Sequence, residues 1–232
     1  MYYVMSDIHG EYDRYLAMLE KIHFCDEDIL FVLGDVVDRG PEPVKVLWDM
    51  SLRANVYPVI GNHELMALDI LQTLLVEVTE DNYDTQITQE VLNHLADWQY
   101  DGGGTTLKKF QELPNEDRIA LMEYMEEFEP YKIIDTEGGN TFILVHGGLG
   151  NYYEGKPFGD YTLEELTMMR PEQNRIYYDQ AVTVIVGHTP TLAINGKPEI
   201  YKSGNVRFID CGAAYNGRLA CLCLDTMQEY YV

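Results

Sequence analysis

Five short segments spread along the chain each carry a residue that can bind a metal ion or move a proton. They are SDIHG (6–10), GDVVDRG (34–40), GNHE (61–64), HGG (146–148) and GHT (187–189). Aspartate, histidine and asparagine offer oxygen and nitrogen donors, which suit manganese, iron or zinc better than a soft thiolate site would. Donors distributed in this way predict a two-metal site assembled from several loops, and such a site favours a phosphate-ester hydrolase.

The spacing of the donors indicates how two ions could be held. Asp7 and His9 lie two positions apart where an apolar run ends, so an extended backbone would project both to one side and let them grip one ion. Asp35 follows a second apolar run, and its two carboxylate oxygens could bridge ions about 3.5–4 Å apart. Three further candidates that end other β elements could complete the second ion: Asn62, His146 and His188.

The segments that must position these residues predict an α/β fold. Apolar runs in the first quarter of the chain predict three buried strands, joined by two helices of which the second starts at Pro41. The strands are expected at 2–6, 29–35 and 56–61, and the helices at 11–22 and 41–53. We expect the functional groups to lie at the carboxyl ends of the strands.

The remaining segments predict a helical insertion followed by a second set of strands. Helical periodicity runs over 64–76, 86–98 and 116–128, interrupted by the glycine-rich DGGGTT at 101–106, and we interpret 64–128 as a helical cap. Strand patterns return from 131, with a hairpin turn at 203–205, and an antiparallel arrangement is one option for them. We predict a two-sheet β-sandwich flanked by helices, in a single catalytic domain over 1–232.

Composition narrows the classes of partner. The chain has 232 residues and a formal net charge of −23 at pH 7. It has no basic stripe that could neutralise phosphates, so we expect no nucleic-acid partner. No run of eighteen apolar residues and no leader-like start occur, so we expect no membrane span and a cytoplasmic location. The four cysteines form no CxxC pair and are expected to be buried free thiols.

Taken together, the five motifs resemble the calcineurin-like metallophosphoesterases. Within that group they are similar to the phosphoprotein phosphatase branch, in its bacterial and phage serine/threonine phosphatase form, and the resemblance spans nearly the whole chain. The branch signature reads Gly-Asp-x-His-Gly, Gly-Asp-x-x-Asp-Arg-Gly, Gly-Asn-His-Glu, His-Gly-Gly and Gly-His-Thr. Ser6 replaces the first glycine and leaves the ligands intact. Pro190 stands where many phosphodiesterases of the superfamily have a metal-binding histidine, which favours the phosphatase branch.

The resemblance implies a ligand set for two divalent ions. Manganese is the expected ion, with iron or zinc as alternatives, and Asp35 is shared between the two positions. The first ion would be held by Asp7, His9 and Asp35, and the second by Asp35, Asn62, His146 and His188. A hydroxide bridging the two ions is expected to attack phosphorus in line, because coordination lowers the pKa of water.

Other residues are expected to act on the phosphate and the leaving group. His63 follows the ligand Asn62 but is left off the metal, so we expect it to be the general acid, held by Asp38 as the resemblance implies. Arg39 is expected to bind the phosphate together with Asn62. The resemblance also implies a second arginine between the last two motifs, for which Arg170 is the choice and Arg175 the reserve. We interpret Asp210 and DGGGTT as structural, although this turn could edge the site.

Three functions follow from these residues. A protein serine/threonine phosphatase acting on phosphorylated proteins or peptides is the first reading. The alternative is a symmetrical dinucleoside tetraphosphate hydrolase, but such enzymes typically have Ala where this chain has Asp38 and Asp where it has Glu64. An inactive, metal-stabilised binding module is the least favoured. The sequence identifies neither the physiological substrate nor the oligomeric state.

Overall fold

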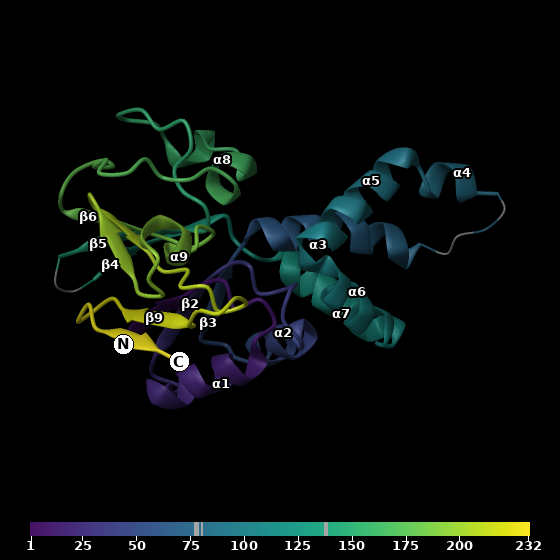
Figure 1. The fold of residues 1–232 in the computed structure, drawn as a ribbon, viewed down its shortest axis with the longest axis horizontal. Coiled ribbons are helices and arrows are strands. Elements are labelled where there is room, and N and C mark those ends of the chain that lie inside the picture. The colour runs from purple at the N-terminus through teal and green to yellow at the C-terminus, as the bar shows by residue number, and fades with distance from the viewer. Residues whose placement is uncertain (77–78, 80, 137–138) are drawn as a thin grey trace.

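The computed structural model describes residues 1–232 except 77, 78, 80, 137 and 138. Two five-stranded sheets are stacked on one another, and an arm of helices extends from one side of them (Figure 1). The predicted two-sheet sandwich with a helical insertion is thereby confirmed. That all of it forms one catalytic domain stays a prediction.

The first sheet contains the three early strands and the last two strands of the chain. In the order in which they pair, its strands are β10 (Glu229–Tyr231), β9 (Ala220–Cys223), β1 (Tyr2–Met5), β2 (Ile29–Leu33) and β3 (Val56–Val59). The pairs β1–β2 and β2–β3 are parallel, whereas β9 is antiparallel to β1 and to β10. The sequence patterns did not predict β10.

The second sheet is mixed rather than antiparallel. Its order is β4 (Tyr131–Asp135), β5 (Thr141–Val145), β6 (Val182–Val186), β8 (Val206–Phe208) and β7 (Tyr201–Ser203). Strands β5, β6 and β8 are parallel neighbours, and only the two edge strands run against them. The reason is that the long connection from β5 to β6 crosses over, which parallel neighbours require.

Helices cover the outer face of the first sheet and build the arm. Helices α1 (Tyr12–Lys21) and α2 (Pro43–Ser51) pack beside β1 to β3, and α2 begins at Pro43, two residues later than expected. The arm consists of α3 (Asn62–Leu75), α4 (Tyr83–Gln86), α5 (Gln89–Trp98), the π-helical η1 (Gln99–Gly103), α6 (Gly104–Gln111) and α7 (Asn115–Glu126). Three short helices lie near the second sheet: η2 (Phe158–Asp160), α8 (Leu163–Thr167) and α9 (Thr191–Asn195).

Alternating side chains of the strands separate two apolar layers. Val4 packs between the sheets with Leu33 and Leu144, whereas its neighbours Tyr3 and Met5 face the helices on the other side. This two-residue alternation fixes the register, because a shift of one residue would exchange the two faces. The sheets are therefore rigid supports for the loops at their ends.

The structure bears on the expectations about membrane spans and about the cysteines. None of the helices in the described part of the chain has the length and apolar character needed to cross a membrane. All four cysteines are free, and three are buried as expected, but Cys25 is exposed.

Two adjacent glycines in the arm provide a test of this packing. A Cβ at Gly103 would lie 2.4 Å from the buried indole ring of Trp98, whereas a Cβ at Gly104 would meet nothing within 4 Å. Gly103→Ala should therefore destabilise the protein by about 1–3 kcal/mol, the usual cost of overpacking. Gly104→Ala is the matched control and should leave the melting temperature unchanged or slightly higher. Equal melting temperatures for the two variants would contradict this packing.

Candidate metal centre

The candidate residues converge at one end of the sandwich. Asp7 and His9 follow β1, Asp35 follows β2, and His146 and His188 follow β5 and β6. Because these strands run parallel within each sheet, their carboxyl ends meet at the same edge. The loops from both sheets therefore meet over a common centre.

Tight backbone turns direct these side chains inward. Six of the residues have left-handed backbone conformations, with φ between 46° and 71°, which non-glycine residues adopt at a cost of order 1 kcal/mol or more each. They are Asp7, His9, Asp35, Asp38, Arg39 and His188. Residues held in such conformations cluster at functional sites, because the surrounding structure must enforce them.

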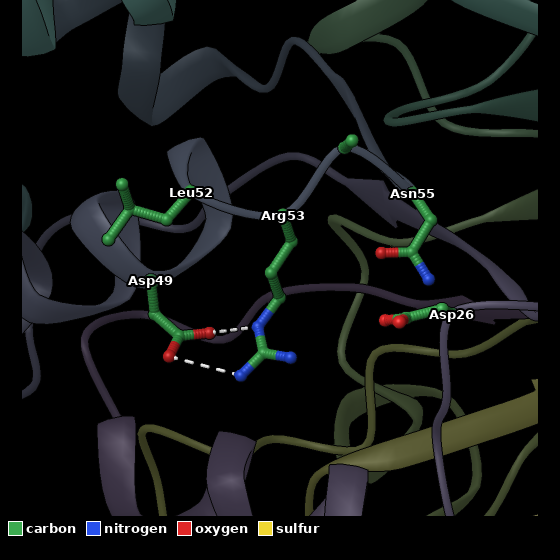
Figure 2. A pocket seen from close by; sticks show the side chains of 6 residues that line it. Asp26, Asp49, Leu52, Arg53 and Asn55 are labelled. Atoms are coloured by element: carbon green, nitrogen blue, oxygen red, sulfur yellow. Dashed lines mark hydrogen bonds and ion pairs between the residues drawn. The ribbon is translucent and has the colours of Figure 1, made fainter.

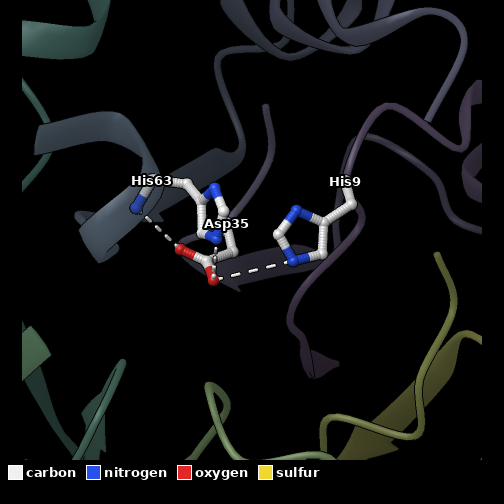
Figure 3. Close-up of side chains that lie close together, drawn as sticks. All are labelled: His9, Asp35 and His63. Carbon is white, nitrogen blue, oxygen red and sulfur yellow. Dashed lines mark hydrogen bonds and ion pairs between the residues drawn. The ribbon is translucent and has the colours of Figure 1, made fainter. Parts of the chain in front are cut away.

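The first group of potential ligands comprises His9, Asp35 and His63 (Figure 3). The Nε2 atoms of His9 and His63 lie 3.7 and 3.8 Å from Oδ2 of Asp35, and all three side chains are buried. His9 and Asp35 were predicted to share one ion, but His63 was predicted to stay off it. The geometry brings His63 as close to the carboxylate as His9.

The second group comprises Asp35, His146 and His188, with Asn62 between the two imidazoles. Nε2 of His146 lies 3.2 Å from Oδ1 of Asp35. The amide oxygen of Asn62 lies 2.9 Å from Nε2 of His146 and 2.9 Å from Nδ1 of His188. The four predicted ligands of the second ion are thus brought together, and Asp35 belongs to both groups.

Backbone carbonyls orient two of the imidazoles. Nδ1–H of His9 donates to the carbonyl of Val37 at 2.8 Å, and Nδ1–H of His146 donates to the carbonyl of Leu33 at 2.7 Å. In each ring this leaves Nε2 to face the centre as a potential metal donor. Such supporting hydrogen bonds are typical of histidines that bind metals.

Asp7 lies beside these groups but belongs to neither. Its carboxylate accepts the Ser6 hydroxyl and the backbone N–H of His188. Ser6, which replaces the glycine of the branch signature, therefore acts directly on a predicted ligand. The role of Asp7 as a ligand stays a prediction.

The ionisable groups of the centre have strongly shifted pKa values. Burial opposes ionisation of Asp35, but the imidazoles of His146 and His63 outweigh it and hold the pKa of this carboxyl well below its usual range. Burial also opposes protonation of His146, yet the Asp35 carboxylate raises its pKa to about 10. Burial and the neighbouring carboxylates Asp210 and Asp35 raise the pKa of Asp7 well above its usual range.

The pKa values of His9 and His188 are lowered, in contrast to that of His146. Burial lowers the pKa of His9 to about 3, and burial together with the charge of His146 lowers the pKa of His188 to about 4. Neutral imidazoles and closely spaced buried carboxylates form the donor set that divalent cations bind. The residues present therefore fit a centre for two such ions, whose positive charge would neutralise the closely spaced carboxylates.

His63 belongs to a hydrogen-bonded network that reaches into the arm. Nδ1–H of His63 donates to Oδ2 of Asp38 at 2.7 Å, and the indole N–H of Trp98 donates to the same oxygen at 2.7 Å. The hydroxyl of Thr106 donates to the other oxygen of Asp38 at 2.6 Å. Burial opposes protonation of His63, but Asp35 and Asp38 prevail and raise its pKa. Protonation of His63 is thus easier than for an ordinary imidazole, and its Nε2 is directed at the centre.

Arg39 lies at the mouth of the centre. Its Nη2 donates to the Asp101 carboxylate at 3.0 Å, its Nε donates to the Asp101 carbonyl at 3.3 Å, and the guanidinium stacks over Tyr215. Nη1 lies 2.5 Å from Nε2 of His9. That imidazole nitrogen cannot serve Arg39 and a metal ion at once, so an ion on His9 requires this contact to open.

The two candidates for a second arginine lie in different surroundings. Nε of Arg170 donates to the hydroxyl of Thr189 at 3.2 Å, in the motif that carries His188. Arg175 instead stacks on Tyr152 and donates to its carbonyl at 3.1 Å. The geometry therefore favours Arg170 over Arg175 for contact with a ligand at the centre.

Several residues of the site were not predicted as functional. Glu64 is buried, and its carboxylate accepts the backbone N–H groups of Asp35, Val36 and Gly61 at 2.7–2.9 Å. Asp210, interpreted as structural, lies close enough to raise the pKa of Asp7. Trp98, Thr106 and Asp101 come from the arm. The glycine-rich turn 101–106, which contains Asp101 and Thr106, was the one part of the arm expected to edge the site.

A hollow lies away from the metal-ligand groups (Figure 2). It has a volume of about 590 Å³ and is lined by Asp49 of α2, by residues 52–55 between α2 and β3, and by Asp26. One wall is the ion pair of Arg53 with Asp49. These residues precede β2 and β3, so the hollow faces the edge of the sheet opposite to the metal-ligand groups.

Comparisons with known proteins agree with this geometry. A sequence model of the calcineurin-like phosphoesterase family matches residues 2–194. Over 88 residues, or 37% of the chain, the sequence is 36% identical to a symmetrical bis(5'-nucleosyl)-tetraphosphatase from Wigglesworthia glossinidia brevipalpis, of which it covers 32%. The chain spans about a third of the length of the curated relatives it matches.

Solved structures share the fold at low identity. A candidate diadenosine tetraphosphatase superposes with a TM-score of 0.66 at 19% identity, covering 100% of this chain and 92% of the other. A serine/threonine phosphatase from Saccharomyces cerevisiae superposes with a TM-score of 0.53 at 14% identity, covering 95% of this chain and 72% of the other. The fold therefore does not distinguish between these two activities.

The shifted pKa values predict how Mn²⁺ binding depends on pH. A pKa of about 10 leaves His146 protonated at neutral pH, so a proton must leave Nε2 before an ion can bind there. Affinity for Mn²⁺ should therefore rise at least about tenfold per pH unit between pH 6 and 8. Calorimetric titrations in buffers of different ionisation enthalpy would count the released protons. Affinity that is independent of pH, without proton release, would contradict this assignment.

Proposed function

The chain belongs to the calcineurin-like phosphoesterases, and from that premise we propose that it hydrolyses dinucleoside tetraphosphates with the aid of two divalent cations. As a metallophosphoesterase it is a metal-binding hydrolase. The observation that carries the proposed substrate is the similarity to the symmetrical tetraphosphatases. The names of these relatives support dinucleoside tetraphosphate hydrolysis, the alternative in the sequence analysis, better than protein phosphatase activity, which was the main prediction.

The structure explains why one argument for the phosphatase has little weight. The resemblance makes Glu64 a marker of that branch, but its carboxylate is fully buried and accepts hydrogen bonds from the backbone of the loop around Asp35. It has no surface toward a substrate. Its identity therefore reports how the loop is braced and carries no direct information about what is hydrolysed.

The proposed roles of the residues follow from their contacts. Bound divalent ions would polarise the phosphoryl group and lower the pKa of a water nucleophile. They would be held by Asp35 together with Asp7, His9, Asn62, His146 and His188. Arg39 has unused N–H donors at the mouth of the centre and would orient the phosphate, with Arg170 on the other side. His63, protonated and held by Asp38, would donate its Nε2 proton to the leaving group.

A phosphomonoesterase is the second candidate, and the pair of His63 and Asp38 favours it. A general acid matters most where the leaving group is a poorly stabilised alkoxide, as in phosphoserine. A nucleoside diphosphate leaves readily without a proton. The buried pair, in which Asp38 accepts hydrogen bonds from His63, Trp98 and Thr106, therefore favours an ester substrate with a basic leaving group as the second candidate.

Competing substrates test the proposal directly. Metal-stripped protein reloaded with Mn²⁺ should hydrolyse diadenosine tetraphosphate with a higher kcat/KM than a phosphothreonine peptide. Product analysis should show two molecules of ADP, as symmetrical cleavage requires. A clear preference for the peptide would refute the dinucleotide assignment and support the second candidate.

Replacement of His63 tests its role as an acid. His63→Asn should lower kcat for a phosphoserine peptide by about a hundredfold or more, the usual contribution of a general acid. The loss for p-nitrophenyl phosphate should be much smaller, because that leaving group needs little protonation. Asp38→Asn should show the same ordering of substrates. Equal losses for the two substrates would remove His63 from this role.

A further inference from the structure

A carboxylate from the helical arm lies within the proposed active site. Oδ1 of Asp101, in η1, accepts from Nη2 of Arg39 at 3.0 Å, and Oδ2 lies 3.5 Å from Nε2 of His63. The side chain is 46% exposed, so it faces the open side of the centre. One carboxylate therefore touches both the proposed phosphate-binding residue and the proposed acid, although none of the roles given above uses it.

The position of Asp101 relative to the reaction follows from these two contacts. His63 Nε2 must face the leaving-group oxygen if it is to donate a proton, and Arg39 must face the phosphoryl oxygens. A carboxylate that lies against both lies beside the bond that breaks, on the side of the leaving group. Any charge that a substrate carries next to its scissile phosphate must therefore come close to Asp101.

The backbone keeps Asp101 in this place. The backbone N–H of Arg39 donates to the carbonyl of Gly102 at 3.0 Å, and Gly102 has a φ of 109° that few other residues adopt. A Cβ at Gly102 would lie 2.6 Å from Cγ of Arg39. The chain of η1 thus runs in direct contact with Arg39, and Asp101 is part of the wall of the site.

Acidic side chains also line a hollow in the arm, between α5 and α3. One and two helical turns back along α5, Asp97 and His94 face Leu65, Met66 and Asp69 of α3 across a hollow of about 350 Å³. His94 Nδ1 is bound to the Asp69 carboxylate at 2.7 Å. Met66 and Asp69 follow His63 at intervals of three residues, so the three residues lie along one face of α3. The hollow is lined by two apolar side chains and two carboxylates, which suits a neutral or cationic group.

We propose that Asp101 is a specificity-determining residue that selects substrates by the charge next to the scissile phosphate. Its carboxylate repels an anionic leaving group and attracts a neutral or cationic one. At a partly exposed site a unit charge several Å away changes binding by about tenfold. This inference rests on the proposed hydrolysis of phosphate esters or anhydrides. A dinucleoside tetraphosphate, whose leaving group is an anionic nucleoside diphosphate, is a substrate that Asp101 disfavours.

The first test compares two substrates that differ only in charge. We would measure kcat/KM for two phosphothreonine peptides with Lys or Glu next to the phosphothreonine, using Mn²⁺-loaded protein. The parent should prefer the Lys peptide, and Asp101→Asn should reduce that preference about tenfold. Any change in Arg39 or in folding affects both peptides alike, so it cancels in the ratio of their kcat/KM values.

A charge-matched control separates a local effect from the net charge of the protein. Glu123 is exposed on α7, outside the site, and Glu123→Gln removes one negative charge as Asp101→Asn does. The control should keep the parental ratio. An unchanged ratio in Asp101→Asn, or an equal shift in both variants, would overturn the inference.

A binding measurement keeps the test independent of turnover. Calorimetry would give the affinities of the Mn²⁺-loaded protein for methylphosphonate and for methylenediphosphonate, which carries a second anionic group beside the first. Asp101→Asn should tighten the diphosphonate relative to the monophosphonate by about tenfold. If no substrate is turned over, the proposed function fails while this ratio still reports on Asp101. If hydrolysis is intact and the ratio is unchanged, Asp101 does not select by charge.

Discussion

The buried carboxylate of Asp35 is the constraint on which the rest of the centre depends. Imidazoles from the loops after β1 and β5 and from the first turn of α3 approach it, and its own loop is held in place by backbone N–H groups that donate to Glu64. Neighbouring backbone is packed so closely that a Cβ at Gly61 would lie 2.4 Å from Oδ1 of Asp35. A carboxylate so confined cannot move to meet a ligand. The ligands must be brought to it, which is what the parallel strands of the two sheets achieve.

The helical arm is connected to this centre by polar contacts as well as by packing. Asp38 receives hydrogen bonds from Trp98 and Thr106 of the arm and also holds the imidazole of His63. Arg39, the next residue, is bound by Asp101 and Gly102. Changes in the arm are therefore transmitted to the orientation and protonation of the proposed acid.

Much of the fold and of the candidate site could be predicted because the information is local. Each motif pairs an apolar strand with a polar residue at its carboxyl end, and both are visible within about ten residues of sequence. The pairing of β9 with β1 could not be predicted in this way, because the partners lie more than 200 residues apart. Trp98 and Thr106 likewise meet Asp38 across more than 55 residues. The periodicity around Trp98 indicates only a helix, and the glycine-rich turn that contains Thr106 indicated only that this segment could edge the site. Glu64 was visible, but its function as a brace depends on backbone groups that the sequence does not distinguish.

The central claim is that Asp35 joins two metal positions, and electron paramagnetic resonance of Mn²⁺-loaded protein tests it most directly. With two ions bridged by one carboxylate, the parent should bind two Mn²⁺ per chain and give the spectrum of a spin-coupled pair. Asp35→Asn should lose the coupling and bind at most one ion tightly. A single uncoupled Mn²⁺ in the parent, or a coupled pair that persists in Asp35→Asn, would contradict the account.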